Sequence, residues 1–185
     1  MRVPTMKHPS LRTVTLVVES LIFTVVVPGT VTAVIPALIL PDGVAVPWPV
    51  AVPQFVGLLL ILAGTNVYFW CLWHFVATGR GIPAPLDHPR QLVVRGLHRY
   101  VRNPMYLGVL CVLVGEALLF RAAALVAYAI AWWLVVHAFV VVHEEPALRA
   151  RFGREYDDYA VAVRRWIPGT AYRRECVGTT GAHVP

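Results

Sequence analysis

The sequence predicts an all-α integral membrane protein with about four transmembrane helices and a cytoplasmic amphipathic helix near the C-terminus. Of its 185 residues, 58% are hydrophobic and only 14% are charged, whereas an ordinary soluble domain carries about 25% charged residues. The basic residues flank the apolar segments instead of lying within them, which is the pattern of membrane proteins. These observations exclude an ordinary soluble domain.

Four apolar segments reach or approach the roughly 20 residues that a helix needs to cross the hydrocarbon core. They are residues 14–40, 50–78, 105–120 and 122–142. Only Arg121 separates the last two, so we expect them to form a tight antiparallel hairpin, because one continuous helix would be too long for the bilayer. The first segment is long and ends without a small-residue cleavage site, so we interpret it as a retained helix and not as a signal peptide.

Basic residues gather on alternate connections between these segments. Three precede the first segment, five lie in residues 79–103 and seven follow Val142, while residues 41–49 contain Asp42 and no Lys or Arg. The positive-inside rule then places both termini and the middle connection in the cytoplasm. Helical spans favour a bacterial inner membrane. The net charge of +6 is explained by this placement, so no nucleic-acid partner is expected.

Apolar and aromatic residues recur every three or four positions after Pro146. This spacing predicts a single amphipathic helix over residues 146–166 that lies on the membrane surface or packs under the bundle. Pro146 suits the first turn of such a helix, and Pro168 with Gly169 ends it. Residues 1–175 are then one domain, and residues 176–185 are expected to be disordered.

Three polar clusters are predicted to meet at the cytoplasmic face. They are Arg95 to Gly108, then His143-Glu144-Glu145, then Arg164 to Pro168. The hairpin returns the first two clusters to the same side, and the C-terminal helix can fold the third over them. The pocket would hold carboxylates, guanidiniums and aromatic rings at the bilayer edge. The three cysteines are far apart without CxxC spacing, so no metal site is expected.

Four motifs in this region carry a resemblance to a known family. They are RNPMYLG (Arg102–Gly108), the Glu144-Glu145 pair, FGREYDDY (Phe152–Tyr159) and RRWIP (Arg164–Pro168). In this order and spacing they resemble the isoprenylcysteine carboxyl methyltransferases and the related membrane phospholipid methyltransferases. The resemblance implies methyl transfer from S-adenosylmethionine to a small hydrophobic or lipid-like acceptor drawn from the membrane.

The polar residues can be assigned roles against that cofactor. Arg99 or Arg102 would pair with its carboxylate, and Glu144 and Glu145 would accept hydrogen bonds from its ammonium or ribose hydroxyls. The predicted cofactor-binding residues are His98, Arg99, Tyr100, Arg102, Asn103, Pro104, Tyr106, Gly108, Glu144 and Glu145. The predicted catalytic residues are Glu145 and Arg164, and Arg164 would orient an acidic acceptor.

Aromatic rings and backbone groups complete this prediction. Tyr100, Tyr106 or Trp166 would face the sulfonium or stack on the adenine, and the backbone near Pro104 and Gly108 would approach the cofactor closely.

Two other classes of function remain open on the sequence alone. One is a membrane reductase of related fold that uses NADPH, and the other is a non-catalytic transporter or assembly protein. Binding of S-adenosylmethionine, of NADPH or of neither separates the three. A thiol, a carboxylate and an amine are equally compatible as the methyl acceptor, and the oligomeric state is open.

Overall fold

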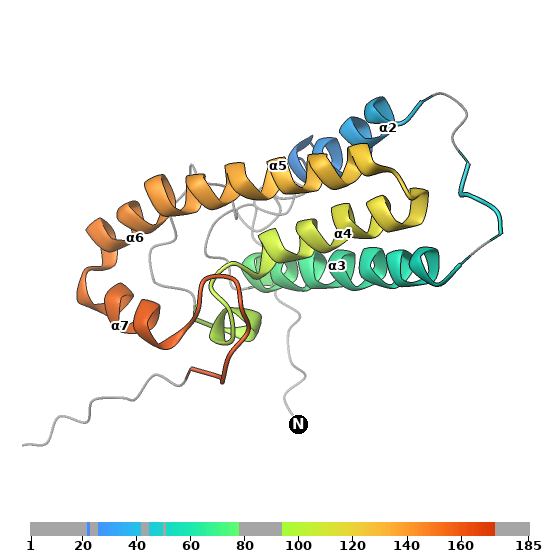
Figure 1. Ribbon diagram of the computed structural model, residues 1–185. Coiled ribbons are helices and arrows are strands. Elements are labelled where there is room, and N and C mark those ends of the chain that lie inside the picture. Colours follow the sequence, from blue (N-terminus) through green and yellow to red (C-terminus); the bar gives the residue numbers. More distant parts are fainter. Residues whose placement is uncertain (1–21, 23–25, 42–44, 50, 78–93, 173–185) are drawn as a thin grey trace, which may run out of the picture.

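The computed structural model describes residues 22, 26–41, 45–49, 51–77 and 94–172. Every regular element in these ranges is a helix, as the composition predicts (Figure 1). In chain order the elements are η1 (Thr30–Val34), α2 (Ile35–Ile39), α3 (Val52–Ala77), η2 (Gly96–Arg99), α4 (Pro104–Phe120), α5 (Ala123–Phe139), η3 (Val140–Glu144), α6 (Glu145–Phe152) and α7 (Arg154–Ala162). Most of residues 14–25 in the predicted first span, and the predicted tail 176–185, lie outside the described residues.

Two helices are long and apolar enough to cross a membrane. One is Val52–His74 within α3, and the other is Ala123–Phe152, which joins α5, η3 and α6 into one rod. A helix that is apolar all round belongs either in a protein core or in a bilayer. Only 28% and 17% of the most apolar stretches of these two helices are buried inside the protein. Their exposure favours the bilayer. α4 and Val26–Ile39 are shorter apolar helices, and four spans remain a prediction.

Four glycines let α3 and α4 pack backbone against backbone. Gly57 lies opposite Gly115, and Gly64 lies opposite Gly108, so the two helices run antiparallel. A Cβ on Gly115 would come within 2.6 Å of the Gly57 carbonyl oxygen, and one on Gly108 within 2.8 Å of the Gly64 carbonyl oxygen. Small residues allow this approach between membrane helices, where packing rather than the hydrophobic effect drives association.

The predicted hairpin between α4 and α5 is confirmed. Arg121 has a left-handed backbone with φ of 50°, and Ala122 is extended before α5 begins. Figure 1 shows α5 returning along α4, which itself lies on α3. The buried side chains at the centre of these three helices are Tyr68, Leu72, Val109, Leu113 and Ala129. α2 contacts the outer side of α5, where the Tyr128 hydroxyl donates to the Val31 carbonyl oxygen at 2.9 Å.

Two prolines are accommodated inside helices by wide turns. The π-helical turn η1 precedes Pro36 by one residue, and η3 precedes Pro146 by one residue. Proline lacks an N–H and its ring clashes with the carbonyl four residues earlier. A π turn changes the hydrogen-bond register at that point. The prediction that Pro146 begins a separate helix was therefore wrong, because α5 continues through η3 into α6.

The prediction of one helix over residues 146–166 was also wrong. α6 ends at Phe152, Gly153 has φ of 52°, and α7 runs from Arg154 to Ala162. A positive φ of this kind suits glycine and breaks the helix. The predicted apolar face still forms, since Tyr156, Tyr159 and Val163 make a second buried cluster. Val163 has an extended backbone, so the chain leaves α7 before Trp166.

Candidate active site

Glu145 stands at the centre of the polar region between α6 and the segments around it. The Arg165 guanidinium binds it with two bonds, Nε to Oε1 at 2.6 Å and Nη2 to Oε2 at 2.9 Å. Arg102 donates from Nη1 to Oε1 at 3.1 Å. The Glu145 side chain is only 7% exposed, and a forked pair of this kind is a strong charge-assisted contact. Glu145 therefore joins α6 to two separate loops.

Glu144, the neighbouring carboxylate, faces a different partner. The Tyr106 hydroxyl on the first turns of α4 donates to Glu144 Oε2 at 3.2 Å. Glu144 is the last residue of η3 and Glu145 follows it directly. The wide turn therefore positions both carboxylates. Among the contacts of the described residues, Glu144 has this single hydrogen bond from a neutral group, whereas Glu145 is bound by two cations.

Residues 163–172, here called the C-terminal strap, cover the segment that leads into α4. Three backbone bonds align the two stretches, from Arg102 N to Arg164 O, from Gly169 N to Tyr100 O and from Tyr172 N to Arg99 O. The Asn103 side chain adds a bond to the Arg165 carbonyl oxygen at 3.3 Å. The strap thereby brings the third predicted cluster against the first, as the sequence predicts.

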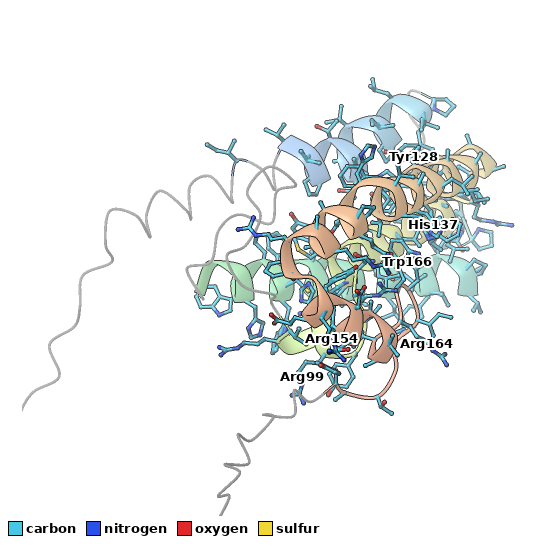
Figure 2. All side chains as sticks on the ribbon, turned by 90° about the vertical axis from the view of Figure 1, so that its left-hand side faces the viewer. Arg99, Tyr128, His137, Arg154, Arg164 and Trp166 are labelled. Carbon is cyan, nitrogen blue, oxygen red and sulfur yellow. The ribbon has the colours of Figure 1, made fainter. Side chains whose placement is uncertain are left out.

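The strap presents Arg165 and not Arg164 to the site. Val163 is buried, Arg164 is exposed, and Arg165 is partly buried. Figure 2 shows Arg164 at the α7 end of the molecule with Arg99 and Arg154. Arg165 therefore supplies the charged contact with Glu145, and the acceptor-orienting role of Arg164 stays a prediction. No periodic signal in the sequence distinguishes the two arginines.

The other predicted site residues divide into two groups. Asn103 and Pro104 are buried at the start of α4, and Arg102 and Tyr106 contact the carboxylates. Gly108 faces α3 across from Gly64, so its missing side chain serves helix packing. Arg99 donates from Nε to the Tyr172 carbonyl oxygen at 2.9 Å, and Tyr100 is 43% exposed. These two lie on the strap side and not beside Glu144.

His98 lies behind the strap against α7. The Tyr159 hydroxyl donates to its carbonyl oxygen at 2.7 Å. The pKa of His98 is lowered to about 4, mainly by burial; a hydrogen bond with the Arg95 backbone opposes this effect, and the nearby His74 adds to it. Burial also raises the pKa of Tyr159, so the phenol stays a neutral donor. The cofactor-binding role of His98 stays a prediction.

The pKa of His98 predicts an acid-sensitive fold. The unfolded histidine titrates near 6.5, so between about pH 6.5 and pH 4 the unfolded chain binds a proton that the folded chain does not. Stability then falls as pH is lowered through this window, by up to about 3 kcal/mol. Thermal unfolding in detergent at a series of pH values measures this slope. His98→Gln removes the titrating group and should flatten it; an unchanged slope would assign the effect to other residues.

An aromatic cluster, here defined as Trp133, His137 and Trp166, joins the strap to α5. The Trp166 indole Nε1 donates to His137 Nδ1 at 2.9 Å. The His137 ring stacks on Trp133 with centroids 5.3 Å apart, and Trp133 and Trp166 lie 6.5 Å apart. Figure 2 labels His137 and Trp166 next to one another, away from the arginines at the α7 end. The sequence placed Trp166 in the site but did not reveal its bond to His137.

No group of three or more potential metal ligands occurs in the part of the chain that the structure describes. Residues 52–155 match the model of the phospholipid methyltransferase family. Two proteins from Oryza sativa, of the subspecies indica and japonica, are each named "Probable protein-S-isoprenylcysteine O-methyltransferase" and are each 29% identical to the chain over 120 residues. These matches cover 62% of this chain and 61% of each relative. No solved structure shows a significant match.

Proposed function

Because this chain belongs to the phospholipid methyltransferase family, we propose that it transfers a methyl group from S-adenosylmethionine to a hydrophobic or lipid-like acceptor at the cytoplasmic membrane face. The family match and the relatives support a membrane methyltransferase of this type. The observation that carries the proposal is the pairing of Tyr106 with Glu144 beside the Arg102–Glu145–Arg165 cluster. Tyr106, Glu144, Glu145 and Arg102 all lie within the matched residues 52–155.

The polar groups of the site fit a cofactor that carries an ammonium and a carboxylate. Glu144 has acceptor capacity beyond its bond from Tyr106. Arg102 Nε is buried and has no hydrogen-bond partner among the described residues, and such orphaned donors are rare in native structures unless a ligand or water binds them. We assign Glu144 and Tyr106 to the ammonium or ribose side and Arg102 to the carboxylate side. When bound, S-adenosylmethionine supplies the electrophilic methyl group.

The contribution of the protein to such a reaction is positioning. Methyl transfer depends on holding donor and acceptor in line at short distance. Glu145 fixes Arg102 and Arg165 in one place, and the strap closes over this pair through its backbone bonds to residues 99–102. In this assignment Glu145 is a positioning residue, because both of its oxygens are already bound by cations. Arg164 remains an exposed candidate for contact with an acidic acceptor.

The acceptor is proposed only as a chemical class. The relatives are named for isoprenylcysteine, a lipid-modified residue, and the chain matches about three fifths of their length. The apolar exposed faces of α3 and α5 support delivery from the bilayer. Thiol, carboxylate and amine acceptors remain equally compatible.

Calorimetric titration of the detergent-purified protein with S-adenosylhomocysteine tests the proposal. We expect saturable binding of this ligand and no binding of NADPH. Binding of NADPH alone would favour the reductase, and binding of neither would favour a non-catalytic membrane protein.

Removing the Tyr106 hydroxyl should weaken cofactor binding. Tyr106→Phe loses the donor that orients Glu144, and Glu144→Gln loses the charge, so we expect about tenfold weaker binding of S-adenosylhomocysteine in each variant. Tyr128→Phe is the matched control. The Tyr128 hydroxyl donates to the Val31 backbone near the start of α5, at the end of that helix remote from Glu144. Normal binding in both site variants would move the cofactor away from this pair.

A further inference from the structure

A partly open apolar groove runs between α4 and α5. Its volume is about 390 Å³, near the lower end of the range for sites that bind one small ligand. Four side chains from each helix line it, and all are apolar or aromatic. They are Leu110, Val114, Ala117, Leu118, Val126, Ala129, Ile130 and Trp133.

The groove follows α4 and α5 lengthwise. The lining positions recur every three or four residues on both helices, so each helix contributes one continuous face. From Leu110 to Leu118 that face extends roughly 12 Å at 1.5 Å per residue. Ala117 and Ala129, which are 4% and 3% exposed, line it where larger residues would fill the space. Unfilled space between packed helices forfeits dispersion energy, which a bound apolar chain restores.

One end of the groove borders the candidate active site. Trp133 both lines the groove and belongs to the aromatic cluster with His137 and Trp166. Trp166 follows Arg165 in the strap, and Arg165 binds Glu145. A ligand chain in the groove would therefore end at the aromatic cluster, on the side where the strap carries its charged contact.

We propose that the groove between α4 and α5 binds the apolar chain of the methyl acceptor, with the aromatic cluster as its inner end. The occupant is a single hydrocarbon chain attached to a polar head, because the lining offers no polar partner until His137 and the strap. The cluster borders the head-group end of the chain and so places the head group at the strap. The identity of the ligand as a methyl acceptor rests on the proposed function, whereas the chain-binding site rests on the groove itself.

Photolabelling of the full chain in lipid nanodiscs tests this site. The probe is tetradecyl phosphocholine with a diazirine at the end of its chain, and unlabelled tetradecyl phosphocholine is the competitor. We expect saturable, competed adducts on groove residues. Ile130→Trp, and independently Val126→Trp, place a large ring at exposed positions of the groove and should reduce this labelling about tenfold. Both positions are about half exposed, so the folded core tolerates them.

Val135→Trp is the matched control, because Val135 is 68% exposed on α5 and does not line the groove. It should leave the saturable adducts unchanged. Labelling that neither saturates nor differs between groove residues and Val135 would overturn the proposal, since bulk lipid contact alone explains it. Persistence of saturable labelling in both groove variants would also overturn it.

Two further readouts separate the parts of the proposal. Titration with S-adenosylhomocysteine should give equal affinity in wild type and Ile130→Trp; absence of binding in wild type would defeat the proposed function while leaving the labelling result intact. Trp166→Ala removes the ring at the head-group end of the groove, so tetradecyl phosphocholine should compete about tenfold less well for labelling, and Trp166→Phe should retain its potency. An unchanged potency in Trp166→Ala would remove the cluster from the site.

Discussion

Replacing Gly64 with alanine should destabilise the protein, although alanine forms helices better than glycine. Helix propensity alone predicts a gain of up to about 1 kcal/mol. A Cβ at this position would instead clash with the Gly108 carbonyl oxygen and would lie 2.9 Å from the Cys111 Cβ. The first of these neighbours is backbone and cannot rotate away, so α3 and α4 must separate. We expect a net loss of about 2 kcal/mol, as for overpacked cores, measured by thermal unfolding in detergent.

The matched comparison uses valine at adjacent positions. Gly64→Val places a branched side chain in the α3–α4 contact, while Ala63→Val places one on the exposed side of the same turn. The first should lower the unfolding midpoint more than Gly64→Ala does, and the second should leave it near the wild-type value. A stabilising effect of Gly64→Ala would show that helix propensity outweighs the close approach.

Glu145→Gln should have the largest effect of any substitution of a charged residue in the described part of the chain. It leaves Arg102 and Arg165 next to a neutral amide, and the side chain of Arg102 is only 12% exposed. Removing one partner of a buried ion pair costs about 3–5 kcal/mol because the remaining charge stays uncompensated. We expect a corresponding fall in the unfolding midpoint and loss of S-adenosylhomocysteine binding, since the strap loses its charged contact with α6.

The exposed pair Arg149–Asp157 provides the control for this substitution. Its atoms are 2.7 Å apart, yet both side chains are more than half exposed, and exposed ion pairs contribute little. Asp157→Asn should leave the midpoint unchanged. The Glu145→Gln/Arg165→Gln double variant should lose less than the sum of the single losses, because the two residues interact directly. Additive losses would indicate that the Arg165–Glu145 contact does not form.

The features that followed from the sequence were those with a local cause. Composition indicated membrane helices, and a single residue between two apolar segments required the hairpin at Arg121. The order of polar clusters along the chain predicted which of them would meet. Each of these depends on short-range rules of length and charge, which a sequence displays directly.

The features that the sequence did not reveal depend on distant contacts. Gly108 packs against Gly64 on another helix, which the sequence did not reveal, while the approach of its backbone to the cofactor stays a prediction. Arg164 and Arg165 are adjacent, and only the end of α7 at Ala162 and the path of the strap decide which one contacts Glu145. The hydrogen bond between Trp166 and His137 joins residues 29 positions apart. No periodicity within one segment encodes such pairs.

The wide turn η3 has a consequence for how this helix can vary. An α-helix advances about 100° per residue, so insertion or deletion of a residue rotates everything beyond it relative to everything before it. A turn that already holds a surplus residue can shed one and return to regular geometry. Deleting one residue from 140–142 would keep the helix intact but turn Glu144 and Glu145 away from α4. The register of this single turn decides whether Glu144 and Glu145 lie beside Tyr106 and Arg102. Related chains can therefore gain or lose the polar site through a change in length alone.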